Sequence, residues 1–173
     1  MKKLIILCLV LLLRSCSSKK ENKIILEHSN SNHYEYNVSN YDFNNLYLKV
    51  YKLVHNKWKA IKSKKYSSNI SKINIDFHDS NSNQYTICYY TEDKNQKIID
   101  KEYNVNFTIN NTDKNILHEK HNTEITLDKT HEYPLVLYEW NNDNETIHTD
   151  FSQIDINSEF NTNDAYIITI SIK

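Results

Sequence analysis

Residues 46–51 read Leu46-Tyr47-Leu48-Lys49-Val50-Tyr51, so aliphatic side chains alternate strictly with tyrosine or lysine. In an extended chain, alternation with a period of two places each set on its own face, and β-branched and aromatic residues favour this conformation. The stretch therefore predicts a β-strand that is half-buried. Its aliphatic side chains should face a core, while Tyr47, Lys49 and Tyr51 occupy the other face.

The same alternation recurs along the chain, at residues 73–77, 85–90, 103–109 and 166–172. Clusters of Asn, Asp and Ser, which favour turns, separate these stretches at residues 79–83, 93–95, 141–144 and 161–164. No stretch of ten or more residues shows a helical period. The pattern predicts an all-β protein, built as an antiparallel β-sandwich.

A faint internal repeat bears on the number of domains. The pattern Leu48-x-Val50-Tyr51 matches Leu135-x-Leu137-Tyr138, and the spacing of residues 73–75 and 85–87 recurs at 154–156 and 166–168. A true duplication would give two small modules in tandem, residues 23–110 and 111–173, whose pattern resembles immunoglobulin or fibronectin type III domains. The alternative is one continuous sandwich of eleven or twelve short strands, and the sequence leaves both open.

Composition restricts the chemistry of the protein. The chain has 173 residues, one proline and no glycine. Turns that need a positive φ are therefore expected to use Asn or Asp, the next most tolerant residues. The absence of glycine excludes the glycine-rich loops that cradle phosphates, and it makes a glycine-flanked nucleophile elbow hard to build.

The amino terminus has the layout of a secretory signal. Lys2 and Lys3 precede an apolar run over residues 4–13, which only Cys8 interrupts. Ten residues make a helix of about 15 Å, half the thickness of a ~30 Å hydrocarbon core. The segment is therefore too short to span a bilayer permanently.

The end of this segment, Leu13-Arg14-Ser15-Cys16, resembles the lipobox of bacterial lipoproteins, Leu-x-small-Cys. Arg14 stands where that family usually has a small or uncharged residue. The resemblance covers sixteen residues. It implies removal of the signal peptide 1–15, acylation of Cys16 with palmitate-type chains, and a polar tether over residues 16–22. It also implies a lipid anchor in the cell membrane or outer membrane, with the protein exposed outside the cytoplasm.

Charge and cysteine content of the processed chain are both informative. Without Lys2, Lys3 and Arg14, 18 basic side chains remain against 22 acidic ones, a net charge of −4. This argues against nucleic acid as a partner and against electrostatic binding to anionic lipid, because both need a basic surface. Cys88 is the one cysteine beyond the lipobox. We therefore expect no intramolecular disulfide and a buried thiol in mid-strand.

Metal and catalytic sites find little support. Asp76 and His78 share one face of a predicted strand, and they are weak candidates for a surface cation site. His118 and His121 are three residues apart, so on a strand they would point to opposite faces, unlike the zincin motif. We expect no enzyme and no cofactor.

Exposed aromatic side chains are the remaining candidates for a site. Tyr47, Tyr51, Tyr138 and Trp140 could form rows that stack on sugar rings or anchor a protein partner, or they could belong to a covered core. The sequence thus favours a lipid-anchored, non-catalytic binding or interaction module for an envelope protein or a glycan. The alternatives are a metal-dependent or enzymatic envelope factor, and an inhibitor or immunity-type lipoprotein that sequesters a peptide or an enzyme.

Overall fold

A computed structural model describes residues 23–39, 41, 43–67, 69–81, 84–99, 103–108, 116–141, 151, 156–157 and 164–173. The predicted signal peptide 1–15, Cys16 and the rest of the tether lie outside the described residues. The described residues form eleven strands and no α-helix. The strands are β1 (Lys23–Asn30), β2 (His33–Asn37), β3 (Asn45–Val54), β4 (Lys57–Ser67), β5 (Ile70–Asn81), β6 (Gln84–Asp93), β7 (Tyr103–Thr108), β8 (Ile116–His121), β9 (Glu124–Thr126), β10 (Tyr133–Asn141) and β11 (Asp164–Ile172).

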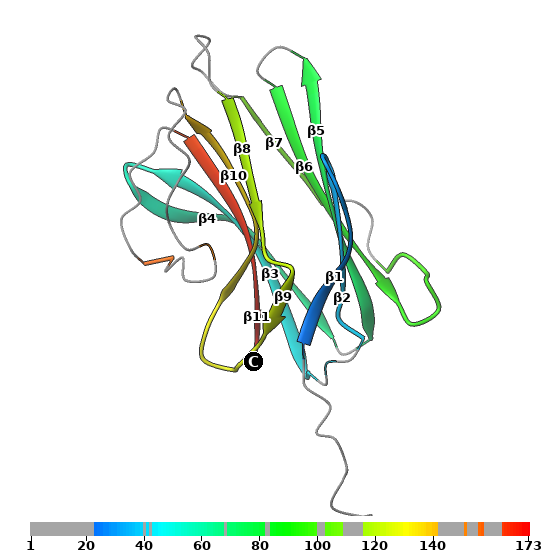
Figure 1. Cartoon of the computed structure of the whole chain (residues 1–173). Coiled ribbons are helices and arrows are strands. Elements are labelled where there is room, and N and C mark those ends of the chain that lie inside the picture. The colour runs from blue at the N-terminus through cyan, green and yellow to red at the C-terminus, as the bar shows by residue number, and fades with distance from the viewer. Residues whose placement is uncertain are drawn as a thin grey trace, which may run out of the picture.

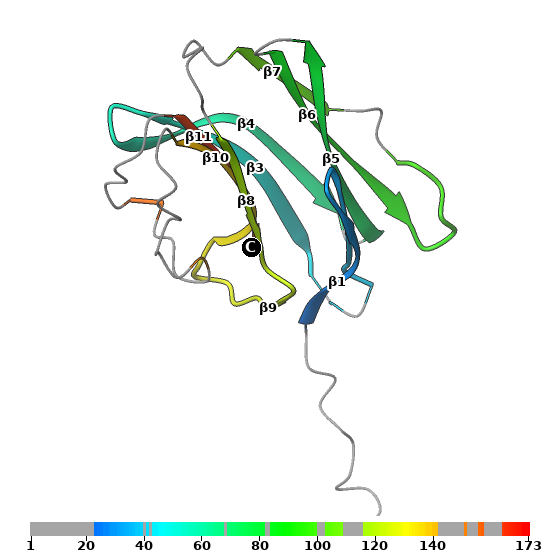
Figure 2. The same ribbon diagram turned by 45° about the horizontal axis from the view of Figure 1, so that its top comes forward.

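The strands pair into two antiparallel sheets that pack face to face (Figures 1 and 2). Sheet A has the order β7-β6-β5-β2-β1-β9, and sheet B has the order β4-β3-β11-β10-β8. The predicted fold class, an antiparallel β-sandwich, is confirmed.

Both sheets take strands from both halves of the chain. In sheet B, β11 pairs with β3 along the register Tyr166↔Lys52 to Ile172↔Leu46, and in sheet A, β9 pairs with β1. Residues 110 and 111 fall between β7 of sheet A and β8 of sheet B. The described strands therefore make one continuous sandwich, the second of the two arrangements that the sequence left open.

The main core fills the space between the sheets and follows the predicted faces. Leu46, Leu48 and Val50 of β3 are fully buried there. Sheet A contributes the alternating inner residues of β5 and β6, which are Ile73, Ile75, Phe77, Ile87 and Tyr89. Each large apolar side chain buried in this way contributes roughly 1.5–3 kcal/mol relative to an exposed one, which makes this core the main source of stability.

A smaller apolar cluster covers part of the outer face of sheet B. Its members are Tyr51, Leu53, Trp58, Leu137, Phe151, Ala165 and Ile167. Because β11 lies in the middle of sheet B, it is buried on both faces, and its residues 165–172 are all buried. A central strand covered on both sides loses the simple alternation of apolar and polar side chains.

Turns adopt positive φ without glycine. His55 and Asn56, which connect β3 to β4, have φ of 50° and 63°, and Gln96 has φ of 60°. The expectation that Asn or Asp would take such positions holds only for Asn56. A two-residue connection with both φ values positive matches the right-handed twist of a hairpin, and that requirement selects the conformation even for His55.

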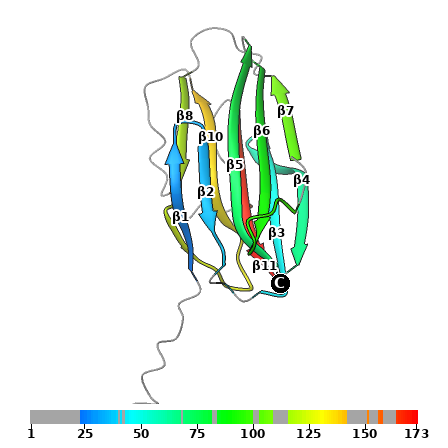
Figure 3. The ribbon, with the colours of Figure 1, turned by 90° about the vertical axis from the view of Figure 1, so that its right-hand side faces the viewer.

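The two ends of the sandwich differ. The terminal end is where β1 begins at Lys23 and β11 ends at Ile172, and the distal end is where β5 ends at Asn81 and β6 begins at Gln84 (Figure 3). Asn37 of β2 pairs on one side with Ile25, near the start of β1, and on the other side with Lys72 of β5. Lys72 therefore lies near the terminal end. From Lys72 to the end of β5 the strand rises nine residues, or about 30 Å at ~3.3 Å per residue.

Candidate functional site

Six aromatic rings fill the distal end of the core. They are Phe77, Tyr85, Phe107, Tyr138, Trp140 and Tyr166, contributed by strands of both sheets, and we call them the aromatic cluster. The ring centroids of Phe107 and Tyr166 lie 3.9 Å apart, and those of Phe77 and Tyr138 lie 4.7 Å apart, both nearly parallel. Stacked and edge-on aromatic pairs add to the stability from area burial, so these contacts stabilise this end of the core.

Strand register brings these rings together. Tyr85 of β6 is opposite Phe107 of β7 in sheet A, and Tyr138 of β10 is opposite Tyr166 of β11 in sheet B. All four lie on inner faces, so the two pairs meet across the space between the sheets. Tyr85 and Phe107 are only half-buried, and each therefore keeps a part that faces solvent.

Beside these two half-buried rings lies an open pocket of about 400 Å³, which we call the distal pocket. Its described lining residues are Gln84, Tyr85, Thr86, Asn106, Phe107 and Thr108. The amides and hydroxyls of Gln84, Thr86, Asn106 and Thr108 lie on the outer face of sheet A, whereas the rings of Tyr85 and Phe107 point to the inner face. The Thr86 hydroxyl donates to Asn106 Oδ1 over 2.9 Å, and this bond leaves the Asn106 amide hydrogens directed elsewhere.

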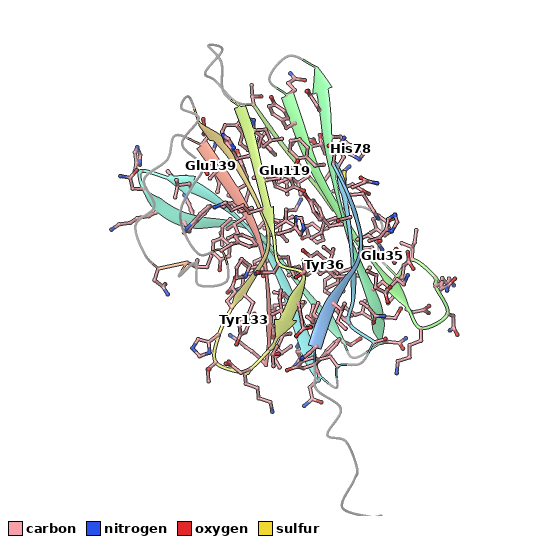
Figure 4. All side chains as sticks on the ribbon, viewed as in Figure 1. Glu35, Tyr36, His78, Glu119, Tyr133 and Glu139 are labelled. Atoms are coloured by element: carbon pink, nitrogen blue, oxygen red, sulfur yellow. The ribbon has the colours of Figure 1, made fainter. Side chains whose placement is uncertain are left out.

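β5 places two further polar side chains beside the distal pocket. Asp79 is opposite Tyr85, and His78 is opposite Thr86; both are exposed, His78 on the outer face of sheet A (Figure 4). Side chains directly opposite each other in an antiparallel pair have Cβ atoms about 4.5–5.5 Å apart. Asp79, which the sequence predicted to begin a turn, belongs to β5. It therefore adds a carboxylate next to the Tyr85 ring.

Tyr138 and Trp140, which the sequence offered as an exposed row, are buried inside the sandwich with 0% and 1% of their surface accessible. The register of β10 shifts between Pro134 and Val136. As a result Leu137 takes the outer face of sheet B, while both rings face the inner core. Of the two possibilities that the sequence left open for these rings, an exposed row and a covered core, the structure shows the covered core. Trp140 instead supports the distal pocket from behind, 5.1 Å from Tyr85 and 5.5 Å from Phe107 between ring centroids.

Tyr47 and Tyr51 lie on the outer face of sheet B, as predicted, but they do not form an open pair. Tyr51 is 8% exposed and belongs to the outer apolar cluster. Between the two rings, Lys49 Nζ donates to Glu132 Oε2 over 2.6 Å and to the Tyr51 hydroxyl over 3.3 Å. The Thr169 hydroxyl also donates to Glu132. An ion pair therefore occupies the gap that two sugar rings would need.

Asp76 and His78 share the outer face of sheet A, as expected. Asp76 Oδ1 lies 2.5 Å from His33 Nδ1 of β2, whereas His78 is exposed two residues further along β5. Within the described part of the chain, no group of three or more His, Cys, Asp or Glu side chains could hold a metal ion. Cys88 lies on the same face, opposite Asp76, and is 5% exposed, so its predicted burial is confirmed.

One polar contact between the sheets was not predicted from the sequence. The Tyr34 hydroxyl of β2 donates to Glu119 Oε2 of β8 over 2.7 Å, and the His121 ring lies 5.0 Å from the Tyr34 ring. Burial raises the pKa of Glu119 and lowers the pKa of His121. Figure 4 shows Glu119 between the two layers. Tyr34 and Glu119 are 85 residues apart. Nothing in the local sequence pattern could pair them.

Comparison of the chain with protein-family models, with curated proteins and with solved structures finds no significant match. Among the described residues, no helix has the length and hydrophobicity needed to cross a membrane. The fold and the distal pocket therefore have to be interpreted on their own chemistry.

Proposed function

We propose that this chain is a lipid-anchored protein of the bacterial cell envelope, and that it binds a ligand without transforming it. Cys16 would carry the acyl chains, because it completes the lipobox-like stretch that ends in Leu13-Arg14-Ser15-Cys16. Two or three acyl chains give stable membrane attachment where one does not. The anchor would hold the protein in the cell membrane or the outer membrane.

The observation that carries this proposal is that the start of the domain and the distal pocket lie at opposite ends of the sandwich. A tether of seven residues reaches at most about 25 Å from the membrane and joins the domain at Lys23, on the terminal end. The distal pocket lies at the other end, about 30 Å along the strands. An anchored molecule would thus present its pocket away from the lipid surface.

Binding without catalysis fits the described lining of the pocket. The amides of Gln84 and Asn106 and the hydroxyls of Thr86 and Thr108 offer hydrogen bonds, and the described lining includes no nucleophile paired with a base. The strands that carry these side chains are held by the aromatic cluster, so a ligand would meet a preorganised surface.

Anchoring is tested by metabolic labelling of the full chain with an alkyne-bearing palmitate in a bacterial host. The native chain should take up label and partition with membranes, whereas Cys16→Ser should lose the label and move to soluble or uncleaved forms. Equal labelling of both would contradict the lipid anchor. Arg14→Ala should be processed faster than the native chain, because it restores an uncharged residue beside the cleavage site.

Binding is tested by surface plasmon resonance with the full chain in detergent micelles. The analyte is envelope extract of the bacterium that carries the gene, used intact, after protease digestion and after periodate oxidation. We expect a saturable response that Asn106→Ala weakens and that Asn95→Ala, an exposed amide in the turn after β6, leaves unchanged. A response that is equal for all three chains would exclude the distal pocket as the binding site.

A further inference from the structure

The edge strand β7 indicates what kind of ligand this protein takes. We propose that an extended, acidic segment of a partner protein pairs with the free edge of β7 and lengthens sheet A by one strand. The assignment rests on the binding function proposed above, because β7 also contributes Asn106, Phe107 and Thr108 to the distal pocket. Three features support it: the character of β7 among the edge strands, the direction of its backbone groups, and the lysines beside it.

Four of the described strands lie at the edge of a sheet, β7 and β9 in sheet A and β4 and β8 in sheet B. An exposed edge offers unpaired backbone groups to another chain, and native proteins usually block it with short strands, charged side chains or bulges. β9 has only three residues, and β8 ends in the titratable run His118-Glu119-Lys120-His121. β4 contains five lysines and a register shift opposite Val50 and Tyr51. Three of the four edges are therefore protected.

β7 has none of these protective features. Its sequence, Tyr-Asn-Val-Asn-Phe-Thr, carries no charge. It pairs with β6 without a register shift, from Tyr89↔Tyr103 to Gln84↔Thr108, and among the described strands β6 is its only neighbour. A regular, uncharged edge of this kind suits strand addition, in which main-chain hydrogen bonds to an extended peptide supply the affinity.

Two contacts show which backbone groups face the free edge. On the side of β6 that β7 occupies, the Ile99 N–H donates to the Thr91 carbonyl over 3.0 Å, so the odd-numbered residues of β6 direct their backbone groups toward β7. From outside sheet A, Lys62 Nζ of β4 donates to the Asn104 carbonyl over 3.2 Å. Because the bonding direction alternates along an antiparallel strand, every second residue of β7 faces the edge. The edge-facing residues are Asn104, Asn106 and Thr108.

Lysines of β4 lie beside this edge. Lys62 is opposite Val50 and Lys64 is opposite Leu48, both inner residues of β3. The same side of β4, which faces sheet A, therefore carries Lys57, Lys59, Lys62 and Lys64. The bond from Lys62 to the Asn104 carbonyl shows that the edges of β4 and β7 adjoin, and Figure 3 shows both strands on one side of the sandwich.

Charge complementarity identifies the partner. A strand added to β7 would direct every second side chain toward the lysines of β4, and carboxylates at those positions would form charge-assisted hydrogen bonds. A second copy of this chain fits less well. Pairing of β7 with another β7 would supply no carboxylate, and it would bring the lysines of two β4 strands to the same junction. We therefore assign the edge to an acidic segment of a different protein.

Amide hydrogen exchange, followed by NMR, gives a direct test. The probe is a short, end-capped peptide of alternating threonine and glutamate, added to the full chain in detergent micelles. In the free chain, the N–H groups of Val105 and Phe107 should exchange slowly, because they bond to β6, and those of Asn106 and Thr108 should exchange fast. With the peptide, Asn106 and Thr108 should become protected as well. This alternation is specific to strand addition.

Two further peptides test the charge and the backbone bonds. The first has lysine in place of each glutamate, and the second has an N-methyl group on each threonine. Because bonded partners in a ladder have side chains on the same face, the threonines are the residues that would bond to Asn104, Asn106 and Thr108. Fluorescence anisotropy of labelled peptides should show saturable binding of the threonine–glutamate peptide and much weaker binding of the other two.

Variants locate the interaction. Asn104→Pro removes an edge-facing N–H but none that bonds to β6, and edge strands tolerate proline; it should weaken peptide binding about tenfold. Slow exchange of the Val105 amide verifies that this variant keeps its sheet. Lys59→Gln and Lys62→Gln should each weaken binding about two- to fivefold, as loss of an exposed ion pair usually does. Lys65→Gln, an exposed lysine on the other side of β4, is the matched control and should bind as the native chain does.

Three outcomes would overturn the assignment: unchanged exchange of Asn106 and Thr108 with the threonine–glutamate peptide, equal binding of the N-methylated peptide, or tighter binding of the lysine peptide. Failure of the strand assignment is distinguishable from failure of the proposed function. If Asn106→Ala loses binding to the envelope extract while Asn104→Pro keeps it, the distal pocket binds a ligand and only strand addition is wrong.

Discussion

The Tyr34 hydroxyl donates a hydrogen bond of 2.7 Å to Glu119 Oε2, and this bond joins β2 of sheet A to β8 of sheet B. Tyr34 is almost fully buried, and Glu119 is half-buried at the edge of its sheet. The close-packed side chains of the core resist sliding of one sheet over the other. A directional polar contact between the sheets adds to this and favours one relative position.

Removal of this hydroxyl should destabilise the fold. Tyr34→Phe leaves the ring in place but takes the donor from a half-buried carboxylate, so we expect a loss of about 1–2 kcal/mol in the free energy of unfolding. Urea titration followed by circular dichroism measures it. Tyr36→Phe, which loses a bond to the neutral Leu135 carbonyl, is the control and should cost less. Equal stability of Tyr34→Phe and the native chain would show that the contact does not hold the sheets.

The raised pKa of Glu119 predicts a pH dependence. Because burial raises the pKa of Glu119 above its usual value of 4.5, the folded chain binds a proton more readily than the unfolded chain does. The stabilising effect of that proton is complete below pH 4.5 and is lost as the pH rises through the folded pKa of Glu119. Glu119→Gln stays uncharged and should abolish this decline.

Thermal melting at a series of pH values tests the prediction. Glu119→Gln should melt higher than the native chain at neutral pH, and the difference should shrink toward pH 4.5. His121 supplies an independent signal in the same region of the fold. Because burial lowers the pKa of His121, its neutral ring contributes stability above pH 6.5. This contribution is lost as the pH falls through the folded pKa of His121. A difference between Glu119→Gln and the native chain that does not vary with pH would contradict the role of the carboxyl proton.

The alternation of apolar and polar residues in the sequence predicted the strands that bury only one face. β3, β5 and β6 follow the expected faces, because each packs on the main core and has a more polar outer side. Edge strand β4 was not predicted, since its lysines, among them Lys59, Lys62 and Lys65, obscure the period. Lysines on an edge strand hinder pairing with another chain, so the feature that hides β4 in the sequence has a physical role.

The candidate site was less predictable. For Trp140 the sequence left an exposed row and a covered core open, because the register shift in β10 and the partial cover on the outer face of sheet B cannot be inferred from a period of two. The distal pocket depends on the pairing of β6 with β7 and on rings from the opposite sheet. Such contacts follow from topology, which alternation alone does not specify.

Trp140 and Tyr47 should respond very differently to truncation. Trp140→Ala removes a large, fully buried ring from the aromatic cluster and should cost about 3–5 kcal/mol, enough to threaten cooperative folding. Tyr47→Ala removes a half-buried ring on the outer face of sheet B and should cost less than about 1 kcal/mol. Differential scanning calorimetry of the two variants gives the comparison. Similar melting temperatures would contradict the burial of Trp140.

Cys88 should be inert in the folded protein. Its side chain is 5% exposed in the middle of β6, and a thiolate, the reactive form, is disfavoured in such a site. In a chain with Cys8 and Cys16 replaced by serine, a thiol reagent should modify Cys88 only as fast as the fold opens, and at once in denaturant. Ser29→Cys, an exposed position on β1, introduced with Cys88→Ser, is the control and should react immediately in the native state.

The rate of Cys88 modification should rise in Tyr34→Phe in proportion to the lost stability, because opening of the sandwich then limits the reaction. Immediate modification of native Cys88 would place the thiol at the surface and contradict the register of β6 between β5 and β7.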